Sequence, residues 1–410
     1  MTLIRLPAIL ITLLLSFSAL AQEQIGFSFD RGNRKVFVPF KRYNNLIVIP
    51  VKVKDQLTLN FVLDTGVQNA ILTNKVYGDI LQLEYDRQVI IRGPGEKDSI
   101  RVFVVDNIDL SLPGITGKNV PLVVLDEDFL KLSNNLGADV HGIIGYDLFS
   151  KFTVEVDYDN DVVVFHDPDR FNQRGYYKRI PISIEYTKPY MDAKILQKDG
   201  TEADVKLLID LGASHALLLN PATSPNISIP GKNLDAVLGS GLGGEIYGKV
   251  GRVSNLQISN FNFSDVISFY PFEEHYGFGL RSGNRNGTVG GELLSHFNLI
   301  FDYKNELLLL NKSHAYKQDF EYDLSGLETM GFGKDYEIIM VKRVRENSPA
   351  AEAGLQRGDI IETVNGTPIS QISLNYVNAL IRSKPKKTIN IRVKRGLEEF
   401  KVKFKLKRLI

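Results

Sequence analysis

The chain contains no cysteine and no tryptophan, and only six of its 410 residues are histidine. Without cysteine there can be no disulfide, no lipid-modified cysteine and no thiol nucleophile. The histidines are scattered, and none belongs to a His-Glu-x-x-His pattern, which would place two metal ligands on one helix face. The sequence therefore gives no reason to expect a bound metal or another cofactor.

An excess of either charge is also missing, because 49 Lys and Arg stand against 48 Asp and Glu. Such a balance provides no general attraction to nucleic acid, and we expect no nucleic-acid partner. Hydrophobic residues make up 43% of the chain and charged residues 24%. These proportions are typical of globular proteins.

Long hydrophobic runs are absent after the first residues. Residues 1–21 combine Arg5, an apolar run over 6–20 and small residues at the end of that run. This pattern predicts a signal peptide, and the run is shorter than the roughly 20 residues of a membrane span. We expect cleavage, no stable span afterwards, and an exported protein that is periplasmic or secreted; a retained anchor is the alternative.

What the chain does contain is an internal repeat. Two aspartates, Asp64 and Asp210, each follow an apolar stretch, and a glycine stands two residues after each. The two segments are residues 61–66, Phe-Val-Leu-Asp-Thr-Gly, and residues 207–212, Leu-Leu-Ile-Asp-Leu-Gly. An offset of 146 residues separates the aspartates, which predicts two copies of one unit.

Three further landmarks recur at nearly the same offset. They are the segments 142–152 and 287–297, the Asp-Tyr pairs at 157–158 and 302–303, and the glycine-marked turns at 93–95 and 239–241. Val, Ile, Phe and Tyr dominate short runs between turn residues, so we expect each copy to be mainly β. We expect helix to be sparse in both copies and predict short helices after Gly145 and Gly290, where an acidic residue suits the first turn.

Paired aspartates can activate water. One carboxylate acts as a general base toward the water while the other, protonated, donates to the carbonyl oxygen of a peptide bond. Two carboxyl groups about 3 Å apart cannot both ionise, so they share one proton. Symmetry between the copies is expected to bring Asp64 and Asp210 together.

The Asp-Thr-Gly segment and the repeated apolar-apolar-Gly segments resemble retropepsin-like aspartic peptidases. The resemblance implies a duplicated two-lobed β fold, with lobe 1 over residues 22–168 and lobe 2 over 169–313. It implies extended peptides or unfolded proteins as substrates, and duplication makes a monomer sufficient. By position it implies a catalytic pair, Asp64 and Asp210, supported by Thr65, Gly66, Leu211 and Gly212, and substrate-covering flaps at Gly93, Pro94, Gly95, Gly239, Ser240 and Gly241.

One position departs from that family. Its members carry Thr or Ser directly after each aspartate, whereas the second copy here has Leu211. We therefore expect Thr65 to lack a matching hydroxyl across the lobe interface. This departure motivates an alternative from another class, a protease-like protein that binds peptides without cutting them.

The segment after residue 313 has a different pattern. Ser348-Pro349 predicts a capped helix start, Asn365-Gly366 a tight turn, and residues 374–383 an amphipathic helix. Together with Gly358-Asp359 these features resemble a PDZ domain of the bacterial exported type, over residues 318–410. The resemblance implies an α+β domain that binds a protein C-terminus, with peptide contacts at Gly326, Leu327, Met330, Gly331 and Phe332.

The glycines at 239–244 also satisfy the G-x-G-x-x-G pattern of dinucleotide sites. That pattern requires a helix directly after it, within a parallel βαβ unit. Residues 245–258 instead predict a strand, so we interpret these glycines as a flap. A nucleotide-dependent enzyme remains the third hypothesis.

Overall fold

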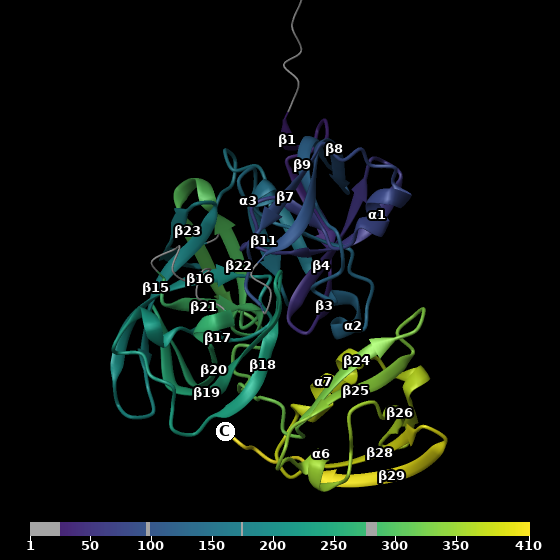
Figure 1. Cartoon of the computed structure of the whole chain (residues 1–410). Helices are drawn as coiled ribbons and strands as arrows, with labels where there is room; N and C mark the ends of the chain where they lie inside the picture. Colours follow the sequence, from purple (N-terminus) through teal and green to yellow (C-terminus); the bar gives the residue numbers. More distant parts are fainter. Residues whose placement is uncertain (1–24, 96–98, 174, 276–284) are drawn as a thin grey trace, which may run out of the picture.

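A computed structural model describes residues 25–95, 99–173, 175–275 and 285–410 (Figure 1). The predicted signal peptide lies outside these residues. Among the described residues, no helix is both long and apolar enough to cross a membrane. The expectation of a mainly β protein is confirmed, because 29 strands in four sheets account for most of the elements of the described residues.

The first sheet forms lobe 1. At the centre of this sheet lie β6, β10 and β5. The strands β10 and β5 pair in parallel, with Gly142 of β10 opposite Phe61 of β5. Its strands in spatial order are β1 (Gly26–Phe29), β9 (Ile115–Leu125), β6 (Ala70–Leu72), β10 (Gly142–Ile144), β5 (Leu57–Leu63), β4 (Leu46–Val53), β8 (Ile100–Leu112) and β7 (Arg87–Ile91), with β3 (Lys41–Tyr43) paired to β4.

The second lobe repeats this pattern of pairing. The strand that ends in Asp210 pairs in parallel with the later glycine-containing strand, as the corresponding strands do in lobe 1. Its strands in spatial order are β14 (Ser183–Glu185), β15 (Lys188–Leu196), β16 (Glu202–Asp210), β21 (Gly287–Gly290), β17 (Leu217–Leu219), β20 (Phe261–Pro271), β19 (Gly244–Ile258) and β18 (Leu234–Gly241). The recurrence is what an internal duplication predicts.

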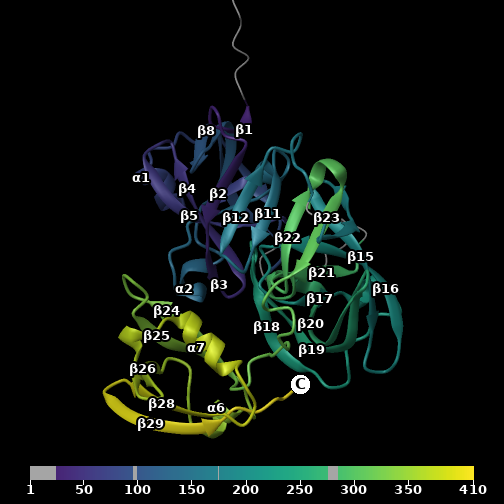
Figure 2. The ribbon, with the colours of Figure 1, turned by 180° about the vertical axis from the view of Figure 1, so that it is seen from behind.

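A six-stranded sheet joins the two lobes (Figure 2). At its centre β11 pairs with β22, with Val154 opposite Phe301 and Val156 opposite Leu299. Its spatial order is β13 (Lys178–Pro181), β23 (Leu307–Lys312), β22 (Phe297–Asp302), β11 (Thr153–Asp157), β12 (Val162–His166) and β2 (Lys35–Pro39). Strands from each copy therefore complete a common layer, and this layer fixes the lobes relative to each other.

Helices are short throughout the lobes. The predicted helices after the two late glycines are present as α3 and α5, with Asp147 and Glu292 in their first turns. The helices and single 3-10 turns of the two lobes are α1 (Lys75–Ile80), α2 (Leu132–Leu136), α3 (Tyr146–Phe149), η1 (Pro221–Thr223), α5 (Gly291–Leu294) and η2 (Tyr303–Asn305).

The C-terminal domain has its own sheet and its own hydrophobic core. Its elements are β24 (Leu327–Phe332), β25 (Ile338–Val344), α6 (Pro349–Glu352), β26 (Ile360–Val364), β27 (Thr367–Pro368), η3 (Ile369–Gln371), α7 (Leu374–Ile381), β28 (Thr388–Arg395) and β29 (Glu398–Lys405). Three local predictions are confirmed: Ser348 caps α6, Asn365 and Gly366 both turn with positive φ, and α7 buries one apolar face.

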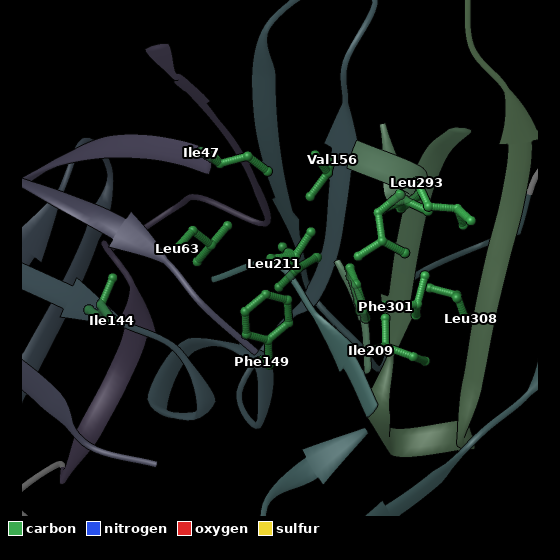
Figure 3. Close-up of a cluster of buried hydrophobic side chains, with 14 of the residues drawn as sticks. Ile47, Leu63, Ile144, Phe149, Val156, Ile209, Leu211, Leu293, Phe301 and Leu308 are labelled. Atoms are coloured by element: carbon green, nitrogen blue, oxygen red, sulfur yellow. The ribbon is translucent and has the colours of Figure 1, made fainter. Parts of the chain in front are cut away.

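One hydrophobic core runs through both lobes and the joining sheet. Figure 3 shows its centre, where side chains from both copies, among them Leu63 and Leu211, surround Phe149. Leu211 is fully buried in this cluster. The residue that departs from the family pattern thus serves as part of the interlobe core.

Candidate active site

The sheet topology brings the two predicted aspartates to adjacent strand ends. Asp64 follows β5, and its backbone N–H donates to the carbonyl of Ile144 at 2.9 Å. Asp210 ends β16 and lies opposite Gly290 of β21. In each lobe the aspartate is therefore fixed at its backbone by the later apolar-apolar-Gly strand, which explains why these two motifs occur together.

Both carboxyl groups are held by the glycine that follows two residues later. The N–H of Gly66 donates to Asp64 Oδ1 at 2.5 Å, and the N–H of Gly212 donates to Asp210 Oδ1 at 2.9 Å. A Cβ on Gly212 would lie 2.1 Å from the carboxyl carbon of Asp64. A Cβ on Gly66 would lie 3.3 Å from both carboxyl oxygens of Asp210. Only glycine leaves room for each carboxyl to approach the opposite loop.

The environment favours a shared proton. Burial raises the pKa of Asp64 well above its usual value, and the nearby charge of Asp210 and a hydrogen bond between the two carboxyl groups raise it further. The Gly66 N–H and the distant charge of Lys188 act in the opposite direction. Burial and the neighbouring carboxyl therefore favour the protonated form of Asp64, and a pair that holds one proton is what general acid and base catalysis needs.

Of the two residues that directly follow the aspartates, only Thr65 contributes a hydroxyl to the lobe interface. Its buried hydroxyl donates to the carbonyl of Ile209 at 2.6 Å and accepts from the N–H of Leu211 at 3.1 Å. As expected, Leu211 returns no hydroxyl, but Thr65 is not left without partners, because it bonds to backbone groups. Thr65 thus supplies one half of a symmetric pair of hydrogen-bonding side chains at the lobe interface. At the position of the other half, Leu211 packs in the hydrophobic core.

A cavity of about 480 Å³ lies over the two aspartates. The flap segments close over it, since the N–H of Gly243 donates to the carbonyl of Pro94 at 2.8 Å and that of Gly95 donates to His275 at 3.0 Å. Pro94, Gly239, Ser240 and Gly241 line the cavity. Gly93 packs near Leu242 rather than lining it.

The glycine-rich segment 239–244 lies between β18 and β19, which pair as antiparallel strands. No helix follows it, so the arrangement differs from a dinucleotide site. No group of three or more His, Asp or Glu side chains in the described part of the chain is placed to hold a metal ion.

Two half-buried residues near the dyad, His215 and Tyr303, are given no role by the sequence. His215 lines the cavity, and burial lowers its pKa to about 4, so the ring is neutral above that pH. The buried hydroxyl of Tyr303 has no partner among the described residues, and burial and the charge of Asp64 raise the pKa of Tyr303. The repeated Asp-Tyr landmark contained Tyr303, but its pattern gave no indication of proximity to the aspartates.

The C-terminal domain lies beside α2 of lobe 1 and β18 of lobe 2 (Figures 1 and 2). Of its predicted peptide contacts, Leu327 lines the same cavity as the aspartates. Gly331 contacts lobe 1, because its carbonyl accepts from Asn134 Nδ2 at 2.8 Å. Gly326 forms a turn with φ of 85°, and Met330 and Phe332 stand in β24 on either side of Gly331. The peptide roles of these residues stay predictions.

Two family models match the chain. One, described as aspartyl protease, matches residues 49–148, and the other, described as PDZ domain, matches residues 340–395. The first match includes Asp64, flap segment 93–95 and the strand β10 that fixes Asp64.

One curated relative is a probable CtpA-like serine protease of Staphylococcus haemolyticus (strain JCSC1435). It is 28% identical over 104 residues, which are 25% of this chain and 21% of that protein. The chain thus spans about a fifth of the length of this relative. Together with the mainly β fold, the two family matches identify a protease-like protein that contains an aspartyl protease-like domain and a C-terminal PDZ domain.

Proposed function

We propose that this protein is an aspartic endopeptidase that hydrolyses bonds in extended peptides or unfolded proteins, with its PDZ domain assisting recognition. The observation that carries the proposal is the convergence of Asp64 and Asp210 beneath a roofed cavity. There burial and the nearby charge of Asp210 raise the pKa of Asp64.

The chemistry needs only these two groups and water. Asp210 takes a proton from water as the water oxygen attacks the carbonyl carbon, while Asp64 gives its proton to the carbonyl oxygen. The tetrahedral gem-diol then loses a hydroxyl proton to Asp64, and Asp210 gives its proton to the departing nitrogen as the C–N bond breaks. One acid and one amine leave, and the pair returns to its starting protonation.

The cavity walls favour an extended chain with apolar side chains near the cut. Apolar residues from both lobes line it, namely Leu46, Val62, Val67, Ile71, Leu130, Leu132, Leu136, Ile143, Leu218, Val237, Leu238, Leu242, Ile246, Ile267 and Phe269. The two flap segments meet above the aspartates, so a folded domain does not fit beneath them. A single polypeptide strand bonded to the flaps does.

A serine mechanism is less well supported, although the curated relative is named a serine protease. Among the hydrogen bonds of the described residues, none joins a serine hydroxyl to a histidine ring or a lysine amine. Ser214 and His215 both line the cavity, but the Nε2 of His215 has no partner in that part of the chain. A serine nucleophile would need such a base beside it.

The test is cleavage of a diverse peptide library by the protein from Gln22 to Ile410, between about pH 3 and 8, followed by mass spectrometry. Asp64→Asn and Asp210→Asn are each expected to abolish cleavage. Asp192→Asn, an exposed aspartate in β15, is the matched control and should cut normally. Full activity in either dyad variant, or loss of activity with a serine-directed phosphonylating reagent, contradicts the aspartic mechanism.

Leu211 favours a second candidate, a peptide-binding protein that has lost catalysis. The missing hydroxyl leaves the Asp210 loop held by Thr65 and by apolar packing. Such a protein would retain library peptides intact, whereas a peptidase would release fragments. We also propose export to the periplasm or medium, for which the apolar run at residues 6–20 is the support; recovery of a chain starting near Gln22 outside the cytoplasm tests it.

A further inference from the structure

The loop before β24 is built to bind an anion but is already filled. Two successive backbone N–H groups, those of Ser325 and Gly326, donate to one carboxylate, an arrangement that binds anions in proteins. Ser325 N donates to Asp323 Oδ1 at 2.8 Å and Gly326 N to Asp323 Oδ2 at 2.7 Å, while Leu327 N donates to Ser325 Oγ at 3.0 Å. Asp323 is only 7% exposed. A peptide carboxylate would have to displace the protein's own.

The charges around this loop also disfavour an anionic chain end. Arg345 Nη2 already bonds to Asp323 at 3.1 Å, and Lys342 forms an ion pair with Glu245 at 2.8 Å. Glu292 and Glu328 also line the cavity. A free peptide carboxylate would have to compete with Asp323 for the guanidinium of Arg345.

The far end of β24 is covered by lobe 1. Asn134 of α2 donates to the carbonyl of Gly331, and the hydroxyl of Tyr336 donates to Asp139 at 3.0 Å. A Cβ on Gly137 would lie 2.6 Å from the Cβ of Leu374. A peptide therefore cannot lie along the whole length of β24.

Between these two closed ends, the groove of the C-terminal domain opens sideways into the catalytic cavity. The groove residues that line the cavity together with Asp64 and Asp210 are Leu327, Glu328 and Thr329 from β24 and its start, and Asn378, Ile381 and Arg382 from α7 and its end. The Thr329 hydroxyl bonds to Asn378 at 3.0 Å, which joins the two groove walls. The open part is thus the stretch beside Leu327, Ile381 and Arg382.

This stretch has donors without acceptors. Arg345 Nη1 and Arg382 Nε are buried and make no hydrogen bond within the described residues. Both residues line the cavity, and a guanidinium group keeps its protons at any relevant pH. The carbonyl oxygens of a peptide backbone can satisfy these donors without adding a negative charge.

A row of rings leads from this stretch to His215, which lines the same cavity as the dyad. The ring of His215 lies 5.6 Å from that of Phe269, which lies 6.1 Å from Tyr322. The guanidinium of Arg345 lies 5.1 Å from the Tyr322 ring. At ~3.3 Å per residue, an extended peptide covers this row with about five residues.

We propose that the PDZ domain binds an internal segment of the substrate polypeptide. The scissile bond of that substrate lies at the dyad, about five residues along the substrate from the bound segment. The ligand is a neutral, extended stretch of backbone and not a free C-terminus. This proposal deepens the proposed peptidase function and rests on it for the identity of the substrate, but it is tested through binding alone.

The test uses the Asp64→Asn variant, so that no probe is cut. The probe is an unstructured, fluorescently labelled peptide with an apolar centre and a length of about 15 residues, which spans the cavity at ~3.3 Å per residue. It is made with a free C-terminal carboxylate and as the C-terminal amide. The dissociation constants of the two forms should agree within about twofold. This is far smaller than a tenfold difference, which corresponds to about 1.4 kcal/mol of binding free energy. A free acid that binds tenfold tighter, or no binding by either form, overturns the proposal.

Arg382→Met, added to Asp64→Asn, should weaken both forms alike, by about three- to tenfold for a lost hydrogen bond. Arg357→Met, at an exposed arginine of the same domain, is the matched control and should change neither. A photo-crosslinking residue placed about five positions from the peptide centre should label the segment around Ile381. Labelling confined to the two lobes contradicts the shared-strand arrangement.

The Asp323→Ala variant should reverse the indifference to the C-terminal carboxylate that is expected of the wild-type loop. Emptying the loop frees the N–H groups of Ser325 and Gly326, so the variant should gain a preference for the free acid of about tenfold. Its melting temperature shows whether the domain is folded, and a folded variant without that preference contradicts the self-filled loop. If the wild-type protein cuts nothing but these binding results hold, the peptidase proposal fails and this one stands.

Discussion

The two lobes present the same strand pairing around different chemistry at one position. In lobe 1 the residue after the aspartate is Thr65, whose hydroxyl bonds across the interface to Ile209 and Leu211. In lobe 2 the corresponding residue is Leu211, which is fully buried in the shared core. The comparison shows that one lobe contributes directional hydrogen bonds and the other contributes packing, so the two halves of the site should respond differently to equivalent substitutions.

The glycines after the aspartates give the largest expected contrast. In Gly212→Ala the new Cβ would lie 2.1 Å from the carboxyl carbon of Asp64, whereas in Gly66→Ala the closest atom is Asp64 Oδ1 at 2.9 Å. Displacing a catalytic carboxyl by about 1 Å costs on the order of 100-fold in rate, so Gly212→Ala should lose at least that much kcat. Gly66→Ala should lose less. Equal rates for the two variants, measured on one peptide, would contradict the asymmetry.

The interlobe bridge gives the second contrast. Thr65→Val keeps the shape of the side chain but leaves the carbonyl of Ile209 and the N–H of Leu211 buried without a partner, at a cost of about 2–4 kcal/mol in unfolding free energy. Leu211→Val removes one methylene from the core and should cost about 0.5–1.5 kcal/mol. Urea denaturation of both variants measures the difference. A larger loss in Leu211→Val would mean that packing, not the hydroxyl, joins the lobes.

The acidic residues of α3 and α5 provide a pH comparison. Burial raises the pKa of Asp147 to about 6 and that of Glu292 to about 7. A carboxyl whose pKa is raised by folding stabilises the native state below its unfolded pKa, and that contribution is lost as pH rises through the folded pKa. We expect stability to fall by on the order of 2 kcal/mol per group, discounted for partial exposure, between about pH 4 and 6 for Asp147 and between about pH 4 and 7 for Glu292.

Neutral variants separate the two contributions. Asp147→Asn should flatten the acidic part of the pH–stability curve, and Glu292→Gln should flatten it up to neutral pH. Urea midpoints taken at intervals from about pH 4 to 8 give both curves. If the curves of both variants match the wild-type curve, folding does not raise the pKa of either carboxyl.

The smallest effect is expected at the contact between lobe 2 and the PDZ domain. Glu245, beside the second flap segment, pairs with Lys342 and with Arg343, and hydrogen bonds from Lys342 and Tyr247 outweigh burial to lower its pKa to about 2. Glu245→Gln should change peptide KM by about fivefold or less, as expected for a partly exposed ion pair worth about 1 kcal/mol or less. The wild-type KM should approach the variant's at high salt. A salt-independent difference would indicate a contact other than this ion pair.

Sequence reasoning located the features that depend on local pattern. The duplicated Asp-x-Gly segments, the strand after the glycine-rich flap and the buried face of α7 each carry a short-range signal, namely a repeat, an alternation or a helical spacing. The apolar strand before each aspartate and the glycine after it were sufficient to predict two carboxyl groups at one place.

The remaining features depend on contacts between distant segments. The bond from Asn134 to Gly331 joins residues 197 positions apart, and nothing periodic in either segment predicts it. The backbone partners of Thr65 were missed because a hydroxyl partner was sought in a side chain. The filled loop at Asp323 could have been suspected, since an aspartate two residues before a serine and glycine commonly bonds to their N–H groups.

The joining sheet has a consequence for how the molecule is made. Its central pair, β11 and β22, brings together strands from opposite copies, so β11 keeps an unpaired edge until the chain has been synthesised at least as far as Asp302. An exposed strand edge is prone to wrong pairing, and a newly made first copy would be the vulnerable species. The same dependence means that no carboxyl pair exists before the second copy has emerged, so under the proposed function the unfinished chain would be unable to cut its neighbours.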